Sequence, residues 1–151
     1  MTEWLEEGQI LVLSGSATRG FTNEDIQEII RISRRKRMFI AVDISKHFLS
    51  ICLKEGIDLL KINNKESVEE YKDRYPCGFN EKKDFIRVIE SERLKRAIIT
   101  FGKDGALLYD HGIILYGKDK KIFSDYSVGS GDSFIAGYLS VMLIITMSAK
   151  L

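Results

Sequence analysis

The chain has few of the residues that build metal centres or disulfide frameworks. Its 151 residues include two cysteines, two histidines and one proline. Cys52 and Cys77 match no metal-binding spacing, and two isolated thiols are typical of a reduced, cytoplasmic protein. We interpret His47 and His111 as surface residues rather than catalysts, His111 because it lies in a predicted hairpin turn. The scarcity of these residues argues against a cysteine–histidine metal site.

The chain also lacks a charge surplus. It has 23 basic and 22 acidic residues, a formal charge of +1, so no overall field favours nucleic acid or an anionic membrane. The basic cluster 31–37 ends a predicted helix, where cations complement the helix dipole, and we interpret it as a solvated helix end. No secretory signal opens the chain, and the apolar stretch 141–151 is too short to span a membrane. We therefore expect neither a nucleic-acid partner nor a membrane partner.

Hydrophobic periodicity alternates between short apolar runs and amphipathic segments. Thr22 and Asp25 form a variant capping box ahead of a helical pattern, and a later helix stops at Gly56. The expected strands are 10–13, 38–43, 57–62 and 97–101, followed by a hairpin that turns at 110–112; the expected helices begin near 22, 45 and 80, with a charged helix ending near 75.

This alternation predicts an α/β domain with a mostly parallel sheet and helices on both faces. In such sheets the functional groups lie at the carboxyl ends of the strands. Asp43, Asn63 and Gly102 fall at or just beyond predicted strand ends. For Asp43, a helix-capping role and a ligand role remain alternatives.

Segment 125–137 carries the clearest chemical signal. Gly129 and Gly131 allow a tight turn, so consecutive N–H groups at the following helix start can converge on an anion. Asp132 would stand beside that anion site, where a carboxylate can accept the proton of an attacking hydroxyl. By itself the string is explained equally well by a turn whose Asp favours the helix dipole.

Four sequence strings, which occur in the order found in one family, favour the catalytic interpretation of Asp132 over a simple helix start. Segment 125–137 resembles the C-terminal signature of the PfkB (ribokinase-like) carbohydrate kinases, with Ser127 and Ser130 where Thr and Ala are commoner. Segments 13–20 and 60–66 resemble the SGSLPxG and IKPNxxE strings of the 1-phosphofructokinase and tagatose-6-phosphate kinase branch, each without its proline. Segment 100–106 resembles the strand and turn beside the nucleotide in that family.

The resemblance implies a ribokinase-like three-layer αβα fold and a function. The chain would be one partial kinase domain, 1–151, that transfers the γ-phosphoryl group of ATP to a hydroxyl of fructose 1-phosphate or tagatose 6-phosphate, with Mg²⁺. Asp132 would be the catalytic base, with the amides of Gly129, Ser130 and Gly131 around the transferring phosphoryl group. Lys61, Asn63, Thr100, Gly102 and Gly105 would bind the nucleotide, and Asn63 with Glu66 would hold the metal and its waters.

Other features favour a chain without turnover. The sugar-binding N-terminal region and β lid of the family are not found in the sequence, and the tail 141–151 departs from the expected adenine-enclosing segment. The alternative is therefore a truncated, inactive domain that binds nucleotide weakly or binds a partner. In either case we expect an exposed apolar surface and a tendency to self-associate.

Overall fold

The computed structural model describes residues 6–15, 20–44, 48–65, 83–118 and 129–148. These residues belong to two compact units, Met1–Asp119 and Lys120–Leu151. The first unit contains the sheet, and the second contains one long helix.

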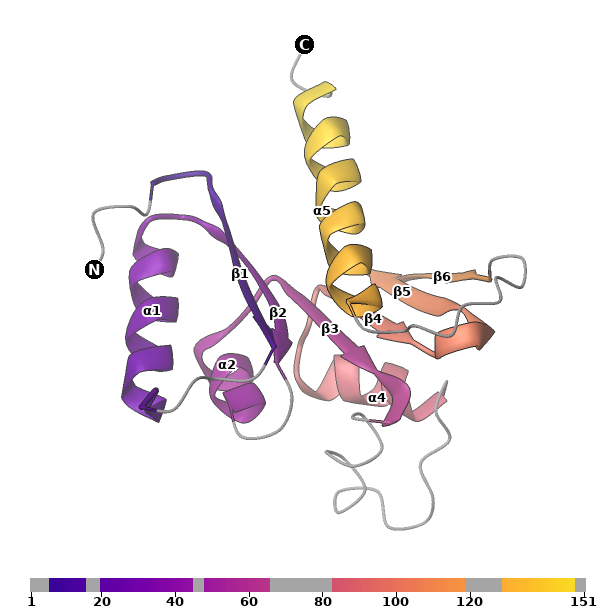
Figure 1. The fold of residues 1–151 in the computed structure, drawn as a ribbon, viewed down its shortest axis with the longest axis horizontal. Coiled ribbons are helices and arrows are strands. Elements are labelled where there is room, and N and C mark those ends of the chain that lie inside the picture. Colours follow the sequence, from indigo (N-terminus) through magenta and orange to yellow (C-terminus); the bar gives the residue numbers. More distant parts are fainter. Residues whose placement is uncertain (1–5, 16–19, 45–47, 66–82, 119–128, 149–151) are drawn as a thin grey trace. The chain divides into compact units, whose positions relative to one another are not determined.

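The first unit contains a six-stranded sheet in the order β1-β2-β3-β4-β5-β6 (Figure 1). Strands β1 to β4 are parallel, and β5 and β6 are antiparallel to their preceding neighbours. The expected α/β class with a mostly parallel sheet is confirmed. The strands are β1 (Ile10–Gly15), β2 (Phe39–Ile44), β3 (Leu59–Asn63), β4 (Arg96–Thr100), β5 (Ala106–Asp110) and β6 (Ile113–Gly117).

Helices connect the parallel strands. α1 (Asn23–Arg35) begins with the predicted capping box, in which the Asp25 amide donates to Thr22 Oγ1 at 3.2 Å and the Thr22 amide donates to Asp25 Oδ2 at 2.8 Å. α2 (Leu49–Glu55) ends at Gly56, whose φ of 85° is one that glycine adopts without strain. α4 (Lys83–Ser91) precedes β4, and the predicted charged helix ending near residue 75 lies outside the described residues.

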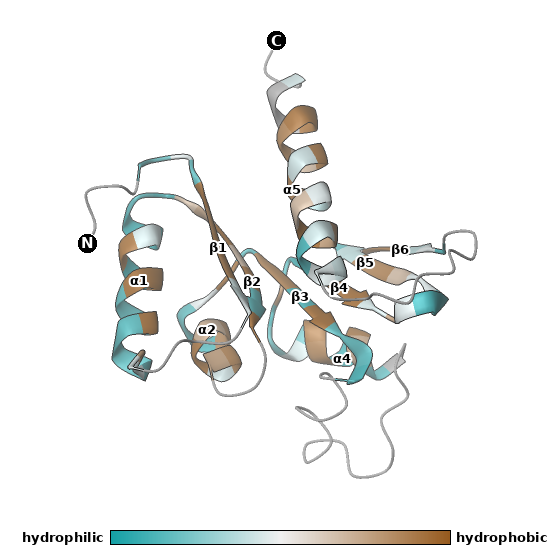
Figure 2. Ribbon diagram, viewed as in Figure 1, coloured by the Kyte–Doolittle hydropathy of each residue, from teal (hydrophilic) through white to brown (hydrophobic). Residues whose placement is uncertain are grey.

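The main core lies on one face of this sheet. Alternate strand residues such as Ile40, Val42 and Leu60 are buried there with helix residues such as Ile30 and Phe85. Apart from Lys61 at its centre, β3 is apolar up to its last residue, Asn63, and Figure 2 shows its end as hydrophilic. The connection after β3 therefore begins in polar sequence at the carboxyl edge of the sheet.

The antiparallel strands form the predicted hairpin. β5 pairs with β6 from Asp110↔Ile113 to Ala106↔Gly117, and the turn between them is His111-Gly112, both with positive φ. Because β6 runs in the same direction as β4, its last residues lie at the carboxyl edge of the parallel strands.

The second unit contains α5 (Ser130–Ser148), which follows Gly129 directly. The helix is apolar along most of its length (Figure 2). Among the described residues, no helix has the length and apolar character needed to cross a membrane.

Candidate functional site

Polar side chains gather on the sheet face opposite the main core. On β2, Val42 and Ile44 belong to the core, so Asp43 between them projects from the other face. On β3, Leu60 and Ile62 belong to the core, so Lys61 projects from the same face as Asp43. Strand alternation thus separates the charged side chains from the apolar core.

Strand register extends this group across four strands. Ser14 of β1 pairs with Asp43 of β2, and Asn63 of β3 pairs with Thr100 of β4. Paired residues of parallel strands project from one face, and all of these positions lie at the carboxyl ends. We call this group the polar edge; it consists of Ser14, Asp43, Lys61, Asn63 and Thr100.

The polar edge contains an ion pair that sequence analysis did not predict. The Lys61 ammonium donates to Asp43 Oδ2 at 2.7 Å, and the two side chains are 7% and 10% exposed. The one sequence signal for this pair was the alternation of side chains along a strand. Each of the two residues is a charged position between two apolar residues of its strand. Asp43, left open between a cap and a ligand, is thus a partner of Lys61.

The turn after β4 brings Gly102 and Gly105 to the same edge of the sheet. A 3₁₀ turn, η2 (Gly102–Asp104), closes with a bond of 3.2 Å from the Gly105 amide to the Gly102 carbonyl, while the Phe101 amide donates to the Gly105 carbonyl at 2.8 Å. Exposed Gly102 has a φ of 57°. Backbone amides in such a turn can approach a ligand closely because glycine has no Cβ.

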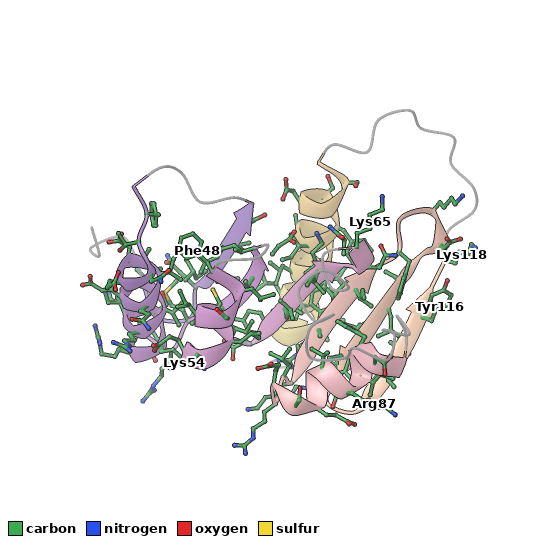
Figure 3. All side chains as sticks on the ribbon, turned by 90° about the horizontal axis from the view of Figure 1, so that it is seen from below. Phe48, Lys54, Lys65, Arg87, Tyr116 and Lys118 are labelled. Carbon is green, nitrogen blue, oxygen red and sulfur yellow. The ribbon has the colours of Figure 1, made fainter. Side chains whose placement is uncertain are left out.

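Tyr116 of β6 and Lys118, which directly follows that strand, contact this turn. The Tyr116 hydroxyl donates to the Asp104 carbonyl oxygen, and Lys118 Nζ lies 3.3 Å from Asp104 Oδ1. Figure 3 labels Tyr116, which lies on the outermost strand, and Lys118, which follows the end of that strand. Sequence analysis assigned no role to either residue, since their contact with Asp104 requires the hairpin register.

In the second unit Gly129 forms the predicted turn before the helix, whereas Gly131, which was expected to share in that turn, lies inside the helix and does not have a positive φ. Gly129 has a φ of 79°, and its carbonyl accepts the amide of Ser133 at 3.0 Å, so the helix begins at Ser130. Ser130, Gly131 and Asp132 therefore occupy the first turn, at the positive end of the helix dipole. Asp132 is exposed. This arrangement can attract an anion and offers a carboxylate beside it.

Of the two predicted metal ligands, Asn63 lies among the described residues and Glu66 does not. Asn63 is half-buried at the end of β3, and its side-chain oxygen is a hard ligand of the kind that Mg²⁺ binds. Within the described ranges, no group of three or more histidine, cysteine, aspartate or glutamate side chains could hold a metal ion.

Known proteins match the chain over most of its length. The profile of the pfkB family carbohydrate kinases matches residues 1–144. The ATP-dependent 6-phosphofructokinase isozyme 2 of Escherichia coli is 30% identical over 132 residues, which cover 87% of this chain and 43% of that protein. The 1-phosphofructokinase of Bacillus subtilis is 26% identical over 136 residues, covering 90% of this chain and 45% of that protein.

Solved structures agree in fold. Phosphofructokinase-2 from Escherichia coli in complex with substrates and products superposes with a TM-score of 0.79 at 28% identity, covering 96% of this chain and 47% of that one. A putative phosphofructokinase from Staphylococcus aureus has a TM-score of 0.78 at 22% identity, covering 93% of this chain and 46% of that one, which shows the fold alone. The chain spans less than half the length of the curated relatives it matches. With the family profile covering residues 1–144, this chain belongs to the pfkB family of carbohydrate kinases.

Proposed function

We propose that this chain carries the nucleotide-binding and phosphoryl-transfer groups of an ATP-dependent kinase whose acceptor is a hydroxyl of a sugar phosphate. The observation that carries the proposal is the polar edge, where Lys61 is held at the carboxyl ends of the parallel strands beside Asn63 and Thr100. Phosphoryl transfer needs positioned cations and N–H donors more than covalent chemistry, and this edge offers both.

Each predicted residue has a role in this proposal. Lys61 neutralises phosphate charge, Thr100 and the glycines of the turn after β4 contact the nucleotide, and Asn63 holds Mg²⁺ together with Glu66. Bound Mg²⁺ would neutralise charge on the phosphate oxygens. The amides of Gly129, Ser130 and Gly131 stabilise the transferring phosphoryl group, and Asp132 accepts the proton of the sugar hydroxyl.

The acceptor is a phosphorylated hexose. Fructose 1-phosphate and tagatose 6-phosphate are the two candidates from the branch that the sequence resembles. The printed names of the relatives, a 6-phosphofructokinase isozyme and a 1-phosphofructokinase, support this class. A cytoplasmic location belongs to the same proposal, and the free, buried thiol of Cys52 is in keeping with it.

The second candidate is a chain that binds nucleotide weakly and has no turnover. It is favoured by the two strings that lack the family proline, segments 13–20 and 60–66. Retention of Asp132, Gly131, Asn63 and Glu66 favours the kinase instead. We expect weak, Mg²⁺-dependent ATP binding by the 151 residues and no turnover, because phosphoryl transfer requires the sugar to be held in line and water to be excluded, and these residues span less than half the length of their relatives.

A coupled assay of ADP release separates the two candidates. It is run with both hexose phosphates on the wild-type chain and on Asp132→Asn, in which the amide cannot take the hydroxyl proton. Turnover by wild type that is lost in Asp132→Asn, with unchanged ATP binding, supports the kinase. Turnover that persists in Asp132→Asn contradicts the role of Asp132, and calorimetry showing no ATP binding contradicts both candidates.

Self-association is a further part of the proposal. β6 is the outermost strand of the sheet, and Ile113, Ile114, Leu115 and Tyr116 are all exposed on it. An exposed apolar edge strand is a template for pairing with a second copy. One relative, phosphofructokinase-2 from Escherichia coli, has a structure described as a tetrameric inhibited form.

A further inference from the structure

The Asp43–Lys61 pair differs from the other ion pairs of the described residues. Both of its side chains are at most one-tenth exposed, at 7% for Lys61 and 10% for Asp43. The Arg31–Glu55 pair between α1 and α2 has the same N–O distance of 2.7 Å, but Arg31 is 57% exposed. A surface pair such as Arg31–Glu55 loses little hydration when it forms, whereas a buried pair loses most of the hydration of both ions, which is unfavourable.

Stability alone does not explain a buried pair at this place. Replacing a buried ion pair by apolar residues of similar volume is often neutral or stabilising. The same sheet face holds fully buried apolar residues one step earlier on the same two strands, Ala41 and Leu59. The face therefore changes from apolar to charged just where the parallel strands end, beside Asn63 and Thr100.

The geometry leaves Lys61 able to bind an anion. An ammonium has three N–H donors, and Asp43 is its partner among the described residues through one of them. A lysine side chain is otherwise a flexible stem whose charge samples many positions. The carboxylate of Asp43 restricts this motion, and because an ionised carboxylate only accepts hydrogen bonds, it directs the remaining donors elsewhere.

We propose that Asp43 is a positioning residue, which holds the Lys61 ammonium at the carboxyl edge of the sheet so that its remaining N–H groups donate to a phosphate group of the nucleotide. This inference rests on the proposed function, since it needs a bound phosphate. Asp43 itself contacts Lys61 and is not assigned a bond to substrate. The two residues form one binding element, so loss of either should have the same effect on affinity.

The test is a double-mutant cycle on ATP affinity, measured by calorimetry with Mg²⁺ on the whole chain. Lys61→Met removes the cation, and Asp43→Asn keeps the shape of the carboxylate without its charge. We expect each to weaken ATP binding about tenfold, and Asp43→Asn with Lys61→Met to be no weaker than Lys61→Met alone, because residues in one network are not additive. Arg31→Met, which removes the exposed pair on the helices, should leave affinity unchanged.

A second double variant tests whether a loss of affinity comes from a loss of folding. Asp43→Leu with Lys61→Met replaces the pair by apolar side chains and should unfold at a urea concentration close to that of the wild-type chain. If this variant folds and binds ATP like wild type, or if Asp43→Asn lowers stability but leaves affinity unchanged, the pair is structural and the inference is overturned.

A readout that needs no nucleotide separates this inference from the proposed function. The ammonium protons of Lys61 should be observable by ¹⁵N NMR in the wild-type chain because a hydrogen bond slows their exchange, and should be lost in Asp43→Asn. A signal unchanged in Asp43→Asn overturns the positioning role alone. A wild-type chain that shows the Asp43-dependent signal but binds no ATP overturns the proposed function, and with it the phosphate role of Lys61.

Discussion

The carbonyl oxygen of Gly117 occupies the place where a Cβ on Gly105 would lie. Gly105 has a φ of 100°, and it joins the 3₁₀ turn of Gly102–Asp104 to β5 while β6 passes beside it. The predicted nucleotide contact of Gly105 therefore sits at a position that packing already restricts to glycine. Folding therefore requires glycine at this position whatever its role in binding.

We expect Gly105→Ala to destabilise the chain more than Gly112→Ala. Both positions have positive φ, but a Cβ on Gly112 would meet no atom within 4 Å. Gly112→Ala should cost roughly 1–2 kcal/mol for backbone conformation alone, and Gly105→Ala about 1–3 kcal/mol more for the displaced backbone. Urea unfolding monitored by circular dichroism measures both. Equal losses for the two variants would mean that the contact with Gly117 relaxes without cost.

The capping box of α1 should make the free energy of unfolding decrease as the pH falls into the acid range. The hydrogen bonds from the Thr22 amide and hydroxyl lower the pKa of Asp25 below its usual value. Because the folded state favours the carboxylate, its stabilisation is present above the usual carboxyl pKa and is lost as the pH falls through the lower folded value. Asp25→Asn should therefore be less stable than wild type at pH 7, and this difference should shrink at pH 2–3. A difference that stays constant with pH would exclude a role for the charge.

The exposed edge strand should govern self-association. Ile113 and Leu115, which are 62% and 57% exposed, lie on the same face of β6. Ile113→Lys with Leu115→Lys places two charges on that edge and should shift sedimentation toward the monomer without changing circular dichroism. Ser50→Lys adds a charge at an exposed position of α2 and serves as the control. If wild type is monomeric at every concentration, the proposed association is wrong.

The buried thiol should be unreactive in the folded chain. Burial raises the pKa of Cys52 to about 11, so at pH 8 almost no thiolate is present in the folded state. In a Cys77→Ser background, Ellman's reagent should label Cys52 only as fast as the chain unfolds, and quickly in urea. Rapid labelling in buffer would show that the core around Cys52 opens without global unfolding.

The parts of the fold that sequence predicted are those set by neighbouring residues. The Thr22–Asp25 capping box, the stop at Gly56 and the His111-Gly112 turn each depend on a few adjacent positions, and all three are confirmed. Strand ends were less accurate. The third strand was expected to begin at Ile57 but begins at Leu59, because the Asp58 side chain accepts the Ile40 amide at 2.8 Å before the regular pairing starts.

The parts of the site that sequence missed depend on register between strands. The carboxylate of Asp43 meets an ammonium 18 residues away, and no local pattern states which residues of adjacent strands face each other. The contact of Tyr116 with the Asp104 carbonyl likewise requires the hairpin pairing. The roles of Asp132, Glu66 and the other predicted site residues remain predictions that the experiments above test.

Because side chains alternate between the two faces of a strand, the polar edge restricts insertions and deletions within its strands. Inserting or deleting one residue within β3 would exchange its faces, so that an ammonium would enter the core beside Phe85 and Ile62 would face the carboxylate of Asp43. A change of one residue in the exposed His111-Gly112 turn would shift the register of β6, but β6 is exposed along its length, so no charge would enter the core. Length variation among natural descendants of this chain should therefore be found in its turns and be absent between Leu59 and Asn63.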